Sequence, residues 1–161
     1  MCIELPQYLL EDGSYRGQIA ITQPRRVAAT SLAIRVSAEQ GQALGALVGY
    51  SVRFDERVSP GTRIKYLTDG MLVREMMGDP LLTRYDVVIV DEAHERTLRT
   101  DVVLAGLKRI LAIRNGDGPD RKGKGKANPL KVVVMSATLD AEKFSKFFEK
   151  CVFLHSYVSH H

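Results

Sequence analysis

Two adjacent carboxylates, Asp91 and Glu92, are the strongest candidates for catalytic residues in this sequence. Asp91 and Glu92 end or follow the apolar run 86–91 (DVVIVD), which is typical of a strand buried on both faces. One carboxylate at such a position can hold Mg²⁺, directly or through water, while its neighbour polarises an attacking water, as nucleotide hydrolysis requires. The alternative is that Asp91 or Glu92 only complements the dipole of a following helix.

Three more polar clusters follow predicted strands. They are TQPRR at residues 22–26, TDG at 68–70 and SAT at 136–138. Because the carboxyl ends of parallel strands meet at one edge of a sheet, we expect all four clusters at that edge, where α/β folds bind ligands. Ordinary turn chemistry explains any one of these clusters, but it explains all four poorly.

The elements that must position these clusters alternate between strand and helix patterns. Strands are predicted at residues 18–23, 47–52, 62–67, 86–91 and 131–136, and helices at 25–40, 69–77, 98–113 and 140–150. We predict a polar turn at 55–61, and we expect residues 131–136 (KVVVMS) to form a second buried strand. This alternation predicts an α/β domain with a mainly parallel sheet flanked by helices.

Length and composition fit one soluble globular domain. The 161 residues are 45% hydrophobic and 26% charged, and the longest apolar runs are strand-sized, so no membrane span is expected. The net charge of +4 and sequence pI of about 9.1 are compatible with a nucleic-acid partner, although solubility alone also explains them. Cys2 and Cys151 lack partners at metal-binding spacing, and we expect both to be free thiols.

Two segments are expected to lie outside the packed core. Residues 115–128 (NGDGPDRKGKGKAN) are rich in glycine and charge and predict a flexible surface insertion. Its basic residues could touch nucleic acid or serve as a weak nuclear address, while a solvated loop is the plainer interpretation. Residues 155–161 are expected to form a frayed tail whose histidines are too irregularly placed for a metal site.

Residues 5–148 resemble the DEAH-box family of superfamily 2 RNA helicases. TQPRRVAA (22–29), TDGML (68–72), DEAHER (91–96) and SAT (136–138) resemble the family's motifs Ia, Ib, II and III, and GYSVRF (49–54) also matches the family. The resemblance implies a partial RecA-like domain of the P-loop NTPase type over residues 1–154. It also implies ATP or another NTP with Mg²⁺ as cofactors, RNA as a partner, and ribonucleoprotein or helicase-activating partners.

The resemblance implies catalytic roles for five residues. Asp91 would coordinate Mg²⁺, and Glu92, beside it in the metal and nucleotide site, would be the general base. His94 would couple the nucleotide site to a second motor domain. Ser136 and Thr138 would link hydrolysis to strand movement.

The resemblance also implies contacts with RNA and with the nucleotide base. Arg25, Arg26, Thr68 and Asp69 would lie along the RNA backbone, where the guanidinium fork suits phosphate. Arg35 falls where the family places an arginine that stacks on the nucleotide base. The alternative for Arg35 is an ordinary solvated arginine on a helix.

The family's phosphate-binding loop is not found in this sequence. That loop ends in Gly-Lys-Ser/Thr and precedes a helix that reads like residues 5–11 (LPQYLLE), which only four residues precede here. We therefore expect an incomplete first motor domain that lacks the phosphate-loop strand and the second motor domain. We expect the strand at 86–91 to show an unpaired edge and an exposed apolar surface as a result.

Two functions are consistent with the sequence. One is a fragment of an ATP-dependent RNA helicase, inactive as an isolated chain, whose parent couples NTP hydrolysis to RNA unwinding or ribonucleoprotein remodelling. The alternative is a non-catalytic RNA- or partner-binding module derived from a helicase. No signal peptide is visible, so we expect an intracellular protein, in the nucleus or nucleolus rather than the cytoplasm.

Overall fold

The computed structural model describes residues 2–116, 128–137 and 141–148, and these contain one six-stranded sheet. The spatial order of the strands is β3-β2-β4-β1-β5-β6. Their bounds are Gln18–Gln23 (β1), Val48–Val52 (β2), Asp55–Arg57 (β3), Ile64–Thr68 (β4), Tyr85–Val90 (β5) and Lys131–Val134 (β6). Every pairing is parallel except that of β3 with β2, which confirms the predicted α/β class.

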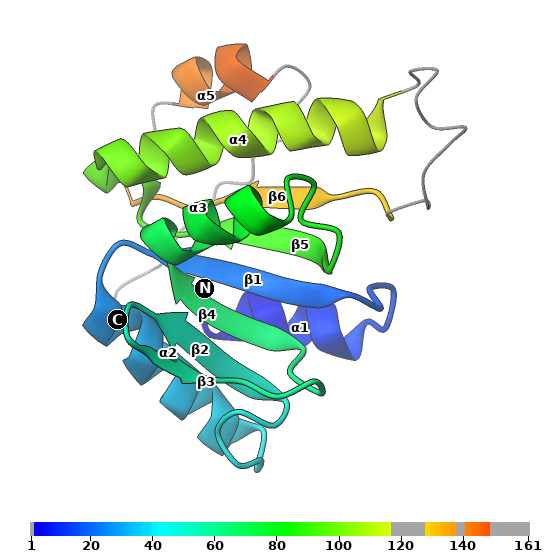
Figure 1. The fold of residues 1–161 in the computed structure, drawn as a ribbon, viewed down its shortest axis with the longest axis vertical. Coiled ribbons are helices and arrows are strands. Elements are labelled where there is room, and N and C mark those ends of the chain that lie inside the picture. The colour runs from blue at the N-terminus through cyan, green and yellow to red at the C-terminus, as the bar shows by residue number, and fades with distance from the viewer. Residues whose placement is uncertain (1, 117–127, 138–140, 149–161) are drawn as a thin grey trace, which may run out of the picture.

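Helices cover both faces of the sheet (Figure 1). The helices α1 (Glu4–Glu11) and α2 (Arg26–Glu39) lie on one face, while α3 (Asp69–Gly78) and α4 (Leu98–Asn115) lie on the other. The last helix, α5 (Ala141–Phe148), lies outside α4, and a short 3-10 turn, η1 (Ala93–Glu95), follows β5. No helix in the described ranges is long and apolar enough to cross a membrane.

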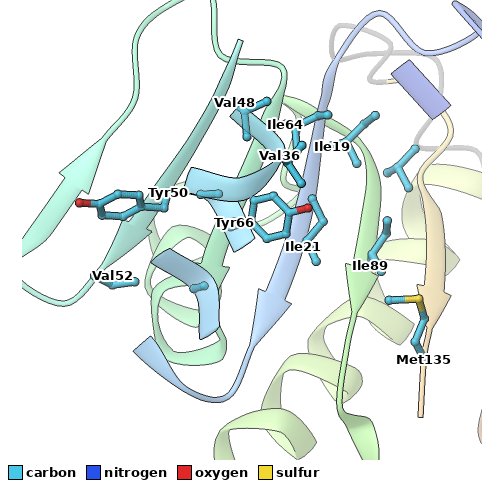
Figure 2. Close-up of a cluster of buried hydrophobic side chains, with 13 residues drawn as sticks. Ile19, Ile21, Val36, Val48, Tyr50, Val52, Ile64, Tyr66, Ile89 and Met135 are labelled. Atoms are coloured by element: carbon cyan, nitrogen blue, oxygen red, sulfur yellow. The ribbon is translucent and has the colours of Figure 1, made fainter. Parts of the chain in front are cut away.

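The side chains of β1, β4, β5 and β6 are divided between two apolar clusters, one on each face of the sheet. On β1, Ile19 and Ile21 pack on the α2 side, whereas Ala20 packs against α3 and α4. Figure 2 shows the ring of Tyr66 within the α2-side cluster, near Ile21. Its hydroxyl donates a 2.8 Å hydrogen bond to the carbonyl of Cys2, which fixes the beginning of the chain to the sheet.

Two expectations about the sheet edges are wrong. The strand that ends before Asp91, β5, pairs with β1 on one side and with β6 on the other, and every residue in it is buried. The outer strand on this side of the described sheet is instead β6, whose residues are exposed or half-buried although the sequence predicts a buried strand. The apolar pattern VVV therefore marks a strand but does not tell a central strand from an edge strand.

The predicted polar turn at 55–61 is also wrong in part, because its first three residues form the antiparallel strand β3. All three are exposed and charged, so no apolar alternation signals them. Their register is fixed by pairing with β2 and by a 2.8 Å hydrogen bond from the hydroxyl of Tyr50 to Asp55. The two residues between the strands, Arg53 and Phe54, form the tip of a hairpin, with Phe54 at φ 67°.

The ends of the predicted insertion at 115–128 are anchored, while its interior lies outside the described residues. The side-chain amide of Asn115 bonds the backbone of Leu130 in both directions, at 2.8 and 2.9 Å. The buried guanidinium of Arg114 donates to the carbonyls of Leu82 and Tyr85, each at 2.9 Å, and also to Asn128. The predicted tail at 155–161 lies outside the described residues as well.

Candidate functional site

The four polar clusters meet at one edge of the sheet, as predicted, with the fourth cluster described only at residues 136–137. The strands β4, β1, β5 and β6 run parallel, and register places Gln23 opposite Thr68, Thr22 opposite Val90, and Val90 opposite Val134. The residues that follow these strands therefore share the carboxyl edge. The strand β2 also runs parallel to β4, so the hairpin tip after it lies at the same edge.

The carboxylate of Asp91, which follows β5 at this edge, is held in place by hydrogen bonds. It is only 8% exposed, and one carboxylate oxygen accepts a 2.6 Å hydrogen bond from the side-chain amide of Gln23. The other oxygen accepts the backbone N–H of Glu92 at 2.9 Å, and the N–H of Asp91 itself donates to the carbonyl of Thr22 at 3.2 Å. These bonds fix the carboxylate before any ligand arrives. Gln23 is a positioning residue that sequence reasoning did not identify.

The backbone after Asp91 is strained. Glu92 and Arg96 both adopt left-handed conformations, with φ values of 54° and 44°, and η1 lies between them. A non-glycine residue in this region costs roughly 1–3 kcal/mol, and such strain often clusters at functional sites. The turn is held by the N–H of Ala93, which donates to the carbonyl of Met135 at 3.1 Å. The side chains of Glu92 and His94 lie together, with Oε2 and Nε2 3.4 Å apart.

The thiol of Cys2 lies beside Asp91. Burial, and then the charge and a hydrogen bond of the Asp91 carboxylate, raise the pKa of Cys2 from its ordinary 9.0 to about 11. The thiol therefore stays protonated at neutral pH and is a poor nucleophile, because the thiolate is the reactive form. Cys2, which precedes α1, therefore lies next to the carboxylate that the sequence analysis identifies as a candidate for catalysis.

The alkylation rate of Cys2 can test the contact between its thiol and Asp91. In a Cys151→Ser background Cys2 is the only thiol, and at pH 8 we expect it to be alkylated on the order of a hundredfold more slowly than in the denatured chain. The negative charge of Asp91 raises the pKa of Cys2, so Asp91→Asn should lower that pKa and make the alkylation of Cys2 several times faster. The neighbouring Glu92→Gln should leave the rate near its original value. Equal rates for Asp91→Asn and the parent would show that Cys2 and Asp91 are not in contact.

The arginines of the candidate site are exposed, and two of them form ion pairs. Arg25 Nη2 lies 3.0 Å from Glu95 Oε1, which joins the segment after β1 to the turn after β5. Arg26 opens α2 and is exposed. Arg35 Nε lies 3.0 Å from Glu39 Oε1, one helical turn along α2. The stacking of Arg35 on a nucleotide base stays a prediction.

The side chain of Asp69 points into the protein. It is 2% exposed, and its Oδ2 accepts a 2.6 Å hydrogen bond from the hydroxyl of Thr100, which is also buried. The N–H of Thr100 in turn donates to the side chain of Thr97, which caps α4. This chain of bonds ties the start of α3 to the start of α4. The RNA contacts of Thr68, itself buried, and of Asp69 stay predictions.

The segment after β6 and the hairpin tip between β2 and β3 also lie at the carboxyl edge. Ser136 follows β6 and is half-buried, while Thr138 lies outside the described residues. Phe54, which the sequence analysis assigned no role, is 89% exposed at the hairpin tip, and the guanidinium of Arg53 lies 4.8 Å from the centre of its ring. The positive φ of Phe54 is visible only in the structure, so no signal in the sequence pointed to this tip.

The described residues do not form a complete site for a metal or a triphosphate. Nowhere in these ranges do three histidine, cysteine, aspartate or glutamate side chains gather as a metal-binding group. Each oxygen of Asp91 accepts one hydrogen bond and keeps a further lone pair, so this carboxylate could contribute one ligand to a metal ion. Mg²⁺ in nucleotide sites relies on one or two carboxylates together with phosphate oxygens and water, and the 161 residues contain no Gly-Lys-Ser or Gly-Lys-Thr run to hold phosphates.

Comparison with known proteins gives close relatives. The chain is 58% identical over 146 residues to the ATP-dependent RNA helicase DHX33 of Homo sapiens, covering 90% of the chain and 20% of that protein. It is 51% identical over 154 residues to the probable ATP-dependent RNA helicase DHR2 of Saccharomyces cerevisiae, covering 94% and 19%. It is 50% identical over 149 residues to the probable ATP-dependent RNA helicase DHX40 of Homo sapiens, covering 92% and 18%. The chain thus spans about a fifth of the length of these curated relatives. No protein-family model matches it.

Proposed function

This chain is homologous to one part of the DEAH-box ATP-dependent RNA helicases, and on that premise we propose that it is the RNA-contacting part of such a motor. In this proposal the carboxyl edge of the sheet lies along the RNA backbone. Asp91 and Glu92, behind the same edge, belong to the nucleotide site of the complete enzyme. The 161 residues alone bind RNA without turning over ATP.

One observation carries this proposal: exposed cations and an exposed aromatic ring gather at the edge that also holds the buried Asp91. Arg25 and Arg26 offer guanidinium groups to phosphate. Arg53 and Phe54 offer a charge and a stacking surface at the hairpin tip. A surface that combines charge with an aromatic platform suits single-stranded nucleic acid, because every base has a face that can stack.

The residues of this chain would prepare the nucleotide site rather than complete it. Gln23 and the N–H of Glu92 fix the Asp91 carboxylate, so its orientation does not depend on a ligand. Glu92 and His94 lie together at the surface of the turn, and the roles of general base and interdomain contact are proposals for them. Metal ligation by Asp91 and Glu92, and the roles of Ser136 and Thr138, are proposals in the same sense.

The second candidate is a non-catalytic module that binds RNA or a protein partner. The burial of Asp91, which is 8% exposed, and its contact with the thiol of Cys2 favour it, because little of the carboxylate is open to a metal ion in the described residues. Genomic sequence that encodes Gly-Lys-Ser/Thr in frame upstream of the Met1 codon would favour the enzyme. A nuclear or nucleolar location and ribonucleoprotein partners remain predictions from the family for either candidate.

The proposed RNA binding can be tested directly with the unmodified chain. A fluorescein-labelled single-stranded RNA of mixed sequence is titrated with protein at several salt concentrations, and anisotropy is measured. We expect the logarithm of the association constant to fall linearly with the logarithm of the salt concentration, since phosphate contacts release counterions. A chain that shows no salt-dependent binding at low salt would contradict the proposal.

A further inference from the structure

We propose that Glu95 is a positioning residue that holds Arg25 and limits how readily this arginine can bind an RNA phosphate. The inference rests on the proposed function, because it deepens the account of the same edge. Among the residues of the DEAHER segment, the sequence analysis assigns roles only to Asp91, Glu92 and His94. Asp91 of this segment bonds Gln23 of the neighbouring strand β1, and Glu95 pairs with Arg25, which follows that strand.

The geometry places the two side chains together from different strands. Arg25 follows β1 and is the N-terminal cap residue of α2, and Glu95 is the last residue of η1 after β5. Because β1 and β5 are neighbours in the sheet, both residues reach the same edge, where Arg25 Nη2 and Glu95 Oε1 lie 3.0 Å apart. The side chain of Arg25 is 76% exposed, while that of Glu95 is 28% exposed.

Glu95 is the fixed member of this pair. Its N–H donates to the carbonyl of Glu92 at 3.0 Å, and it lies just before the left-handed residue Arg96. The guanidinium of Arg96 is turned to Asp101, with bonds of 2.8 and 3.2 Å, so Glu95 is left to pair with Arg25. Arg25, by contrast, has a long and mostly exposed side chain that can change its partner at small cost.

An RNA phosphate must therefore compete with Glu95 for the same guanidinium. Exposed ion pairs are weak, so phosphate can displace Glu95, but the carboxylate stays nearby and repels the incoming negative charge. Glutamine at this position keeps the size of the side chain and removes its charge. Because η1 also begins directly after Glu92, the turn that carries a proposed nucleotide-site carboxylate is the turn that holds an RNA-binding arginine.

The experiment is a double-mutant cycle on RNA affinity in the full chain. The variants are Glu95→Gln, Arg25→Ala and their combination, each titrated with the same labelled single-stranded RNA at low salt. We expect Glu95→Gln to tighten binding by about twofold to fivefold. In the Arg25→Ala background the same substitution should change affinity by less than about 1.5-fold, since Glu95 acts through Arg25.

Asp55→Asn provides the control for a general charge effect. Asp55 begins β3 beside the hairpin tip at the same edge, and asparagine can still accept the hydrogen bond from Tyr50. The substitution removes one negative charge without touching Arg25 or Glu95, so its effect should be the same in both backgrounds. Equal tightening by Glu95→Gln with and without Arg25, or no tightening at all, would overturn the inference while leaving RNA binding intact. Absence of RNA binding by the unmodified chain would instead overturn the proposed function, and this inference with it.

Discussion

Replacing Arg25 and Arg26 together with alanine is expected to weaken RNA binding by about tenfold to a hundredfold at low salt, since charge-assisted contacts to phosphate are among the stronger polar interactions. The loss should be similar for all RNA sequences, because phosphate contacts carry no sequence information. The slope of binding against salt should also become shallower by about 1.4, if each arginine neutralises one phosphate of a single strand. Titrations at four or more salt concentrations measure both quantities.

A matched control removes two arginines from the opposite edge of the sheet. Arg16 precedes β1 and Arg84 precedes β5, so both lie at the amino edge, and both are exposed. The double variant Arg16→Ala with Arg84→Ala changes the net charge by the same amount as the test variant. It should keep the salt dependence of the unmodified chain. Equal losses of RNA affinity in the two double variants would mean that the affinity depends on the net charge of the protein and not on the arginines of the carboxyl edge.

The second large effect concerns ATP: the 161-residue chain is expected to show no magnesium-dependent hydrolysis, although it contains the sequence DEAH. Asp91 can place a metal ion only beside phosphates that are already held, and Glu92 can activate water only against a positioned γ-phosphate. Positioning and charge stabilisation account for nearly all of phosphoryl-transfer catalysis. The described residues fix one carboxylate but offer no cradle for a triphosphate.

Phosphate release with ATP and magnesium, followed in the presence and absence of RNA, measures this directly. Asp91→Ala and Glu92→Gln serve as controls for contaminating hydrolases, because a contaminant is unaffected by either substitution. Turnover that requires magnesium and disappears in both variants would show that these residues form a working site by themselves. The expected result is a rate no higher than that of either control.

The parts of the fold that the sequence predicts well are those where the pattern and the burial agree. The run 85–90 is continuously apolar, apart from Asp86, because β5 is covered on both faces and paired on both sides. The helix α2 shows its core-facing residues Ala29, Ala33 and Val36 at helical spacing. Parallel strand order then brings the polar clusters to one edge, which is why the place of the candidate site in the fold could be predicted from the sequence.

The remainder depends on tertiary contacts that no local pattern records. The strand β3 is a charged edge strand whose pairing with β2 alone defines it. The inward direction of Asp69 follows from its bond to Thr100, 31 positions away, and the pairing of Arg25 with Glu95 spans 70 positions. A residue type and a motif therefore identify a candidate for the site, but only packing decides whether its side chain faces solvent, a neighbour or the core.

The central claim, that RNA lies along the carboxyl edge of the sheet, is tested most directly by mapping the amides that respond to RNA. At 17.9 kDa the chain is within reach of two-dimensional amide spectra recorded with and without a short single-stranded RNA. Our account predicts that the largest shifts occur at residues 22–27, 53–54, 68–70 and 93–96. The amino edge, at residues 12–17, 59–63 and 79–84, should change little. Shifts concentrated at the amino edge, with the carboxyl edge unaffected, would contradict the account.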